Sequence, residues 1–133
     1  MAKKFITQLN EDPTAAVINA VNNYLKSIPG NQKPLSGVHY YLVELLEADY
    51  DMGDINFKLV QSVGGDEDEG PYVSRVFEIT ERQYEVDGSY NRQIAHILLT
   101  GHFNSWEGTE WDDKVVIVYP KQVMVVEYTT SAT

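Results

Sequence analysis

Apolar side chains recur at helical spacing in one clear stretch of the chain, between residues 11 and 29. Asp12 suits the cap of the first turn, Pro13 the first helical position, and Pro29 with Gly30 the end of the helix. Lys26 lies favourably near the C-terminal end of the helix dipole. One apolar stripe is predicted, consisting of Val17, Ile18, Val21, Tyr24, Leu25 and Ile28.

Two flanking segments have less decisive patterns. Lys3–Gln8 alternates briefly, which predicts either an edge strand or a loose N-terminal arm. Val38–Asp51 fits both a strand and a helix, because its tyrosines and valines favour strand whereas the run LVELLEA favours helix. We expect a strand there, with the helix as the alternative.

The remainder of the chain alternates between apolar and polar positions in short runs, which is typical of β-strands. The acidic segment Gly64–Gly70 is predicted to be a loop, and Asp87-Gly88 a hairpin turn of the primed kind. Gln93–Phe103 is apolar on both faces, so we expect it to be a central strand. The predicted strands are Ile55–Val63, Tyr72–Val86, Gln93–Phe103, Val115–Tyr119 and Val123–Thr129.

These elements predict an α+β fold. We expect a single antiparallel, curved β-sheet of five to six strands, half-barrel or sandwich-like, with one N-terminal amphipathic helix packed on it. The 133 residues fit one domain. Its predicted parts are an arm at 1–10, a helix at 11–29, a β-rich body at 38–129 and a flexible tail at 130–133.

Charge is distributed unevenly along the chain. The net charge is −10, and residues 41–133 hold eighteen carboxylates against six lysines and arginines. Such a field repels phosphate backbones and attracts basic surfaces. The sequence therefore argues against direct nucleic-acid binding and for a protein partner with a basic surface, although surplus acid also simply keeps a small protein soluble.

The absence of cysteine excludes disulfides, thiolate metal sites and a cysteine nucleophile. The sequence has no apolar run long enough to span a membrane and no apolar core of a secretory signal at its start. We therefore expect a cytoplasmic protein that does not associate with membranes.

The stretch SWEGTEWDD places both tryptophans of the chain among four carboxylates. One interpretation is a hairpin tip in which a tryptophan covers the open end of the core. The other is a docking surface, because interfaces favour tryptophan and an acidic rim suits a basic partner. The predicted partner-binding residues are Trp106, Glu107, Glu110, Trp111, Asp112 and Asp113, together with Asp66, Glu67, Asp68 and Glu69 of the acidic loop.

Residue patterns typical of catalysis or metal binding are weak. His96 and His102 share a face of one predicted strand but lie about 20 Å apart at the rise of a strand, too far to share a metal unless Gly101 introduces a bulge. The acidic clusters at Asp49–Asp54 and in the 64–70 loop lack the glycine and glutamate of a calcium loop, which leaves weak divalent-ion binding as the most they offer. We expect no enzymatic activity, no metal site and no cofactor.

The closing pattern FNSWEGTEWDD…VYPKQVMVVEY resembles the C-terminal ends of small bacteriophage proteins, which implies a viral accessory protein in the host cytoplasm. We expect a non-enzymatic acidic protein-binding module, in its sharper form an inhibitor that docks a nucleic-acid-binding surface. One alternative is a structural or assembly protein, either a virion component or a homo-oligomer joined through sheet edges. The other is a small-ligand-binding α+β cone-type domain or enzyme, with His96 in its cavity.

Overall fold

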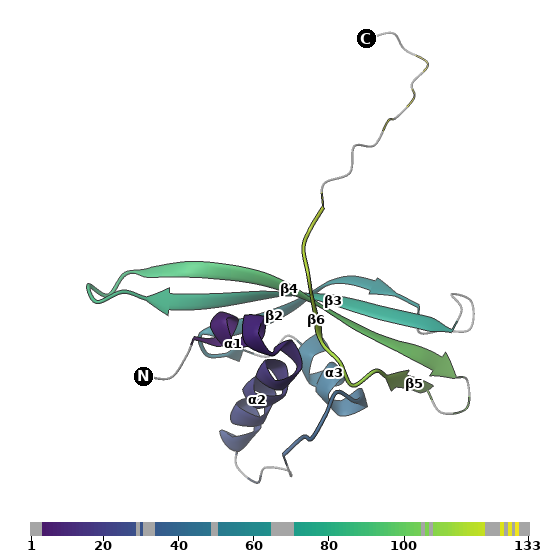
Figure 1. The fold of residues 1–133 in the computed structure, drawn as a ribbon, viewed down its shortest axis with the longest axis horizontal. Helices are drawn as coiled ribbons and strands as arrows, with labels where there is room; N and C mark the ends of the chain where they lie inside the picture. The colour runs from purple at the N-terminus through teal and green to yellow at the C-terminus, as the bar shows by residue number, and fades with distance from the viewer. Residues whose placement is uncertain are drawn as a thin grey trace.

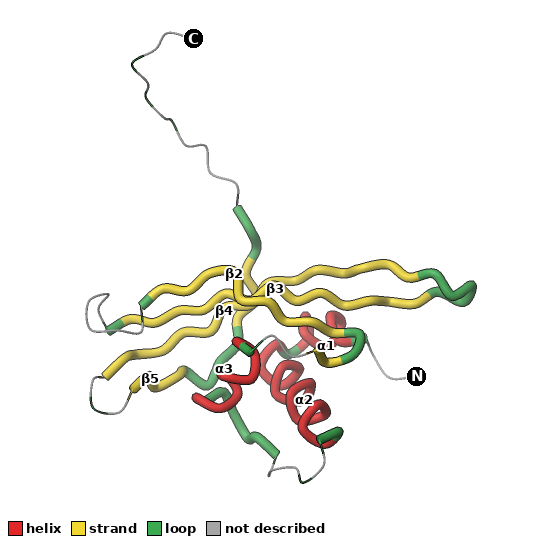
Figure 2. The backbone as a smooth tube through the Cα atoms, turned by 180° about the vertical axis from the view of Figure 1, so that it is seen from behind, coloured by secondary structure: helices red, strands yellow, loops and turns green. Residues whose placement is uncertain are grey.

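The computed structural model describes residues 4–28, 30, 34–48, 51–64, 71–104, 106, 108–121, 126, 128 and 130. In this part of the chain, three helices and six strands form two layers, with the helices packed on one face of the sheet (Figure 1, Figure 2). The elements in chain order are α1 (Phe5–Glu11), α2 (Pro13–Lys26), α3 (Tyr40–Glu47), β1 (Asp51–Met52), β2 (Ile55–Val63), β3 (Tyr72–Tyr84), β4 (Tyr90–Asn104), β5 (Gly108–Trp111) and β6 (Val116–Val118). None of the helices described is long and apolar enough to cross a membrane.

All neighbouring strands of the sheet are antiparallel, in the order β1-β2-β3-β4-β5, with β6 also paired to β4. The sheet is curved and does not close, and the expected α+β class and strand number are confirmed. β4 pairs with β3 on one edge and with β5 and β6 on the other. The central position predicted for this strand is therefore confirmed.

α2 follows the signals in its own sequence. The Asp12 carboxylate accepts a hydrogen bond from the Ala15 amide at 3.2 Å, Pro13 begins the helix and Lys26 lies in its last turn. The helix ends at Lys26, before the predicted boundary at residue 29. Its buried residues are Ala16, Val17, Val21 and Leu25.

The N-terminal arm predicted at residues 1–10 is wrong over its described part, because Phe5–Glu11 forms helix α1. Phe5 and Leu9 lie one helical turn apart and are both buried. The carboxylate of Glu81 in β3 accepts hydrogen bonds from the backbone amides of Phe5 and Ile6, at 2.6 and 3.2 Å. A partner distant in sequence therefore satisfies the first amides of α1, and the local pattern contains no sign of it.

The strand expected within Val38–Asp51 is also wrong, since residues 40–47 form helix α3. In a helix, Leu42, Val43, Leu45 and Leu46 can all turn toward one layer, and all four are buried. In a strand these four side chains would divide between two faces. The helical alternative wins because it buries all of them against the core.

The β3–β4 hairpin is confirmed, but its turn has three residues instead of two. The Glu85 amide donates to the Ser89 carbonyl at 2.8 Å and the Gly88 amide to the Glu85 carbonyl at 3.1 Å. Gly88 has a φ of 90°, which suits the closing position of a three-residue loop. Of the predicted strand at 123–129, only Val126 and Tyr128 are among the described residues, and neither lies in a strand.

The core lies between the helices and one face of the sheet. Register pairs Phe77 with Ile97 and Arg75 with Leu99, so the odd-numbered side chains of β3 and β4 face the helices. The even-numbered side chains face away, and no helix of the described chain covers them. The buried core of both layers includes Leu9, Val17, Val21, Leu42, Leu46, Phe57, Phe77, Ile79, Ile97 and Leu99.

Candidate functional site

Two acid-rich segments of the sequence are anchored at one end of the sheet, which we call the acidic end. The first runs from Gly64 to Pro71 between β2 and β3, and the second from Asn104 to Asp113 around β5. The Phe103 amide donates to the Pro71 carbonyl at 2.6 Å, which joins the two anchor points directly. Together the segments hold eight of the twenty carboxylates of the chain and no lysine or arginine.

Trp106 is the most exposed aromatic residue described at the acidic end. Its side chain is 93% exposed, in the connection between β4 and β5. The side-chain oxygen of Asn104 accepts a hydrogen bond from the Trp106 amide at 2.8 Å, and Gly108 adopts a φ of 79° where β5 begins. The Trp106 amide is therefore bonded to Asn104, whereas the ring itself is almost fully exposed.

Trp111 has a different environment from Trp106. It pairs with Gly101 on the helix-bearing face of the sheet and packs against the hydrophobic core. The guanidinium carbon of Arg75 lies 5.8 Å from the centre of its ring, and Arg75 also forms an ion pair with Glu47 of α3 at 3.1 Å. The predicted docking surface was expected to include both indoles, but only that of Trp106 is exposed. Trp111 instead fills the junction of β3, β5 and α3.

The carboxylates of the predicted site also differ in their surroundings. Asp113 accepts a hydrogen bond from the Val38 amide at 2.8 Å, and Asp112 accepts one from the Thr100 hydroxyl at 2.7 Å. Glu110 is exposed and pairs with His102 on the uncovered face. The remaining predicted residues, Asp66, Glu67, Asp68, Glu69 and Glu107, lie outside the described residues, and only the positions of their anchor points are established.

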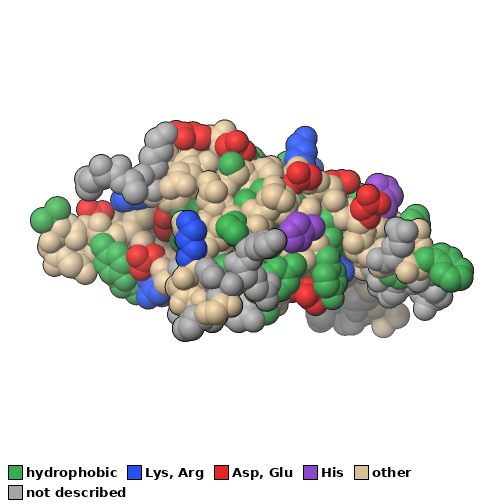
Figure 3. Space-filling view, turned by 90° about the horizontal axis from the view of Figure 1, so that it is seen from below, with side chains coloured by type: hydrophobic (Ala, Val, Ile, Leu, Met, Phe, Trp, Pro, Cys, Tyr) green, Lys and Arg blue, Asp and Glu red, His purple; other side chains and the backbone are tan. Residues whose placement is uncertain are grey.

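The helix-bearing side of the molecule is also acidic. Figure 3 shows carboxylates gathered toward one margin of this side. Glu44 and Glu47 of α3 are exposed there, close to the Trp111 junction. The negative charge near the acidic end therefore continues onto α3.

The uncovered face has a shallow hollow of about 700 Å³, lined by Val76, His96, Leu98, Val118 and the chain leaving β6. His96 Nε2 lies 3.3 Å from a carboxylate oxygen of Glu78, its cross-strand neighbour. His96 therefore lines a hollow on the face of the sheet that is turned away from the helices.

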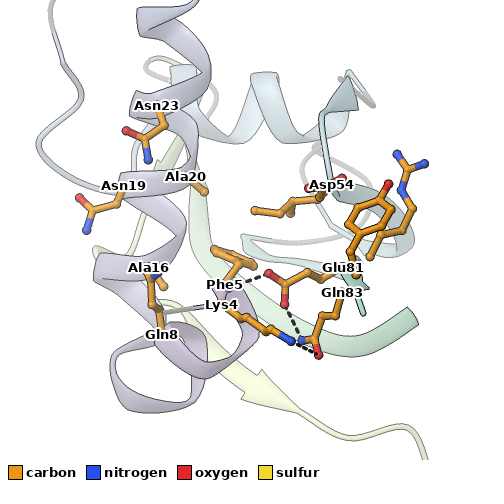
Figure 4. A pocket seen from close by; sticks show the side chains of 13 residues that line it. Lys4, Phe5, Gln8, Ala16, Asn19, Ala20, Asn23, Asp54, Glu81 and Gln83 are labelled. Atoms are coloured by element: carbon orange, nitrogen blue, oxygen red, sulfur yellow. Dashed lines mark hydrogen bonds between the residues drawn. The ribbon is translucent and has the colours of Figure 1, made fainter. Parts of the chain in front are cut away.

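A second hollow of about 420 Å³ opens between α1, α2 and β3 (Figure 4). Its buried charged group is Glu81, whose carboxylate accepts from the Phe5 and Ile6 amides and from the Gln83 side chain at 2.9 Å. Lys4 reaches Gln83 at 3.5 Å. The carboxylate is thus occupied in holding α1 on the sheet.

The three histidines do not converge. His96 pairs with Glu78 and His102 with Tyr72, six cross-strand pairs further along, while His39 precedes α3. Gly101 sits in regular register with Val73, so it introduces no bulge between the two strand histidines. No group of three metal-ligating side chains occurs in the described part of the chain.

Two exposed groups have pKa values shifted by local hydrogen bonds. The hydroxyl of Tyr40 donates to Glu44 at 2.7 Å, and this bond to a nearby carboxylate raises the pKa of Tyr40. The hydroxyl and amide of Ser89 donate to Asp87 at 2.6 and 2.9 Å, which lowers the pKa of Asp87. Both are surface contacts within one helix or one turn, and the Tyr40–Glu44 contact lies at the edge of a hollow beside Trp111.

The sequence patterns did not predict one cluster of polar side chains. Arg82 and Arg92 lie opposite each other on the uncovered face, and Tyr84 and Tyr90 form the next pair on the same face toward the hairpin turn. These four residues are placed symmetrically about Asp87 in the sequence. A hairpin centred on Asp87 pairs Arg82 with Arg92 and Tyr84 with Tyr90, so both pairs could have been predicted from the hairpin turn.

Comparisons of the chain with protein-family models, with curated proteins and with solved structures find no match.

Proposed function

We propose that the protein is a non-enzymatic protein-binding module that docks a basic partner surface with the acidic end of its sheet. The observation that carries the proposal is the exposure of Trp106 at the point where both acid-rich segments are anchored. An indole exposed to this extent buries a large apolar area when a partner covers it, at a small cost in side-chain entropy.

The chemistry of the partner follows from the charge around the indole. Trp106 lies within one of two segments that are rich in carboxylates and free of basic side chains, and both segments are anchored at the same end of the sheet. Such a rim speeds association with a positively charged surface and discriminates against an acidic one. In its sharper form the proposal is a phage-type accessory or inhibitor protein whose carboxylates occupy the nucleic-acid groove of a host protein.

The non-enzymatic part of the proposal is supported by the way polar groups are used. Glu81 is consumed by the first amides of α1, and His96 has Glu78 as its neighbour on an open surface. Every buried side-chain nitrogen and oxygen in the described chain has a hydrogen-bond partner. The hydrogen-bonding capacity of these groups is used within the protein. None of them lies in a closed cavity where it could act as a general acid or base.

The proposal is tested by capture from an extract of the source cell. Immobilised wild-type protein is compared with Trp106→Ala and with Tyr119→Ala, which removes a similarly exposed ring elsewhere. We expect a basic protein to be retained by the wild type and the Tyr119 variant at low salt. Trp106→Ala and high salt should each release it, and retention that ignores both changes would contradict the docking mechanism.

A second candidate function is assembly, with a second copy of the chain as the occupant of the uncovered face. The observation in its favour is that this face and the adjoining edge of β2 expose Val60, Val63, Ile94 and Val116. The part of β4 before His96 also has one edge without a strand partner in the described chain. Light scattering over a range of concentrations tests this function, and a monomer throughout would contradict it.

A further inference from the structure

Four side chains form a cluster on the uncovered face near the β3–β4 hairpin, at the end of the sheet away from the acidic end (Figure 1). Arg82 lies directly across from Arg92, and Tyr84 directly across from Tyr90. Residues two apart in a strand point to the same side, so the two arginines and the two tyrosines share one surface. We call this set the arginine–tyrosine cluster.

The arginine pair is unfavourable unless an anion joins it. Like charges directly opposite each other across two strands destabilise a sheet. One guanidinium nitrogen of Arg82 donates to the Gly53 carbonyl at 3.0 Å, and the Arg92 guanidinium lies 5.9 Å from the centre of the Tyr90 ring. Neither arginine forms an ion pair with a carboxylate in the described chain, whereas Arg75 on the other face is paired with Glu47.

A hollow adjoins the two arginines and has room for an anion. Its volume is about 310 Å³, near the lower end of the range for small-molecule sites, and it lies between the β1–β2 turn and strands β3 and β4. Thr80 and Asn56 line it together with Arg82 and Arg92. Asp54 contributes one carboxylate, so two positive charges face one negative charge in a protein whose net charge is −10.

The two tyrosines place exposed aromatic rings beside the arginines, one same-face pair closer to the hairpin turn. Their ring centres lie 5.6 Å apart with the ring planes inclined at 56°, and both rings are about half exposed. Guanidinium groups fit phosphate oxygens with two parallel hydrogen bonds, and exposed rings stack on nucleobases. We propose that the arginine–tyrosine cluster binds a small phosphate ester that carries a flat ring, of the mononucleotide class, with the phosphate on Arg82 and Arg92 and the ring on Tyr84 and Tyr90.

The site lies at the other end of the sheet from the acidic end. The proposal of phosphate-ester binding can therefore be tested independently of the proposed docking function. Its test uses the full-length protein and three probes: adenosine monophosphate, ribose 5-phosphate without the base, and adenosine without the phosphate. Binding is followed by amide chemical shifts in an NMR titration. We expect adenosine monophosphate to bind at least about tenfold more tightly than either fragment, with shifts centred on residues 80–84 and 90–94.

Arg92→Gln is the informative variant, because Arg82 also holds the β1–β2 turn through Gly53. It should weaken adenosine monophosphate binding by at least about tenfold, and Tyr90→Leu should weaken it while leaving ribose 5-phosphate unchanged. Lys114→Gln removes the same charge at an exposed position outside the cluster and should change affinity less than about twofold. Thermal unfolding monitors that each variant is folded.

Three results would overturn the proposal. The first is the absence of shifts at millimolar adenosine monophosphate, and the second is equal binding by folded Arg92→Gln and wild type. The third is equal affinity for adenosine monophosphate and ribose 5-phosphate, which would leave an anion site without the aromatic platform.

Discussion

Arg75 lies against the ring of Trp111, with the guanidinium carbon 5.8 Å from the ring centre, and the same side chain pairs with Glu47 at 3.1 Å. This arrangement joins β3, β5 and α3, and it separates the roles of two tryptophans that look alike in the sequence. Trp111 stabilises the fold, whereas Trp106 is free to meet a partner.

The first prediction concerns these two rings. Trp111→Ala should lower the free energy of unfolding by about 2–4 kcal/mol, because it removes a half-buried ring from the core and leaves Arg75 without its aromatic contact. Trp106→Ala should change stability by less than about 0.5 kcal/mol, as expected for an exposed side chain. Denaturant unfolding of both variants measures the difference, and equal effects would contradict the assignment of roles.

The second prediction concerns the attachment of α1. Glu81→Ala leaves the amides of Phe5 and Ile6 without their acceptor at a buried site, and we expect a loss of about 2–4 kcal/mol in stability. Hydrogen exchange should become faster throughout α1, while α2 keeps its protection because Asp12 caps it independently. Glu85→Ala, at an exposed position close by in the chain, is the control and should leave α1 protected.

The third prediction concerns Asp113, which belongs to the predicted docking set but also holds the segment before α3. Its carboxylate accepts from the Val38 amide at 2.8 Å, so Asp113→Ala should cost about 1–2 kcal/mol of stability. Asp112→Ala tests the neighbouring bond to Thr100, which is exposed, and should cost less. If Asp113→Ala unfolds at the wild-type denaturant concentration, this contact contributes nothing to the fold.

The fourth prediction is a pH dependence in the hairpin turn. Bonds from Ser89 stabilise the charged form of Asp87 and lower its pKa in the folded protein. The resulting contribution to stability is present above the unfolded pKa of the carboxyl group and is lost as the pH falls through the folded pKa. Ser89→Ala should raise the pKa of Asp87 toward its ordinary value in an NMR titration, and an unchanged value would show that the hydroxyl bond has no effect.

The elements that were predicted correctly carry their determinants within their own sequence. Asp12 and Pro13 mark the start of α2, and alternating side chains mark the long strands. By contrast, α1 depends on Glu81, whose bond to Phe5 spans 76 positions in the chain. The short, mixed pattern of apolar and polar residues in this segment therefore could not distinguish a loose arm from a helix.

The candidate site could be predicted only in part, because the direction in which Trp111 points depends on strand register. The pairing of Trp111 with Gly101 turns its ring toward the helices, and this pairing is fixed by how β5 docks on β4. No local pattern could reveal which of the two rings would be buried. The symmetry of Arg82 and Arg92 about Asp87, however, follows from the hairpin alone and could have been read from the sequence.

The fifth prediction tests how closely β5 must approach β4 to place Trp111 and the acidic end. A Cβ atom added at Gly101 would lie 2.6 Å from the backbone oxygen of Glu110 and 3.1 Å from the Cα of Trp111. Backbone atoms cannot move aside as a flexible side chain would, so Gly101→Ala must push β5 away from β4. We expect a loss of about 1–3 kcal/mol in stability, in the range of other overpacking substitutions.

The same displacement should separate Trp111 from Arg75 and shift tryptophan fluorescence toward longer wavelengths, a change that a variant containing only Trp111 would isolate. Asn91→Ala, in β4 but far from β5, is the matched control and should leave fluorescence unchanged. Wild-type stability and fluorescence in Gly101→Ala would mean that β5 does not pack this closely. The Trp111 junction would then be looser than the register implies, and the acidic end would lack the rigid support on which a preorganised docking surface depends.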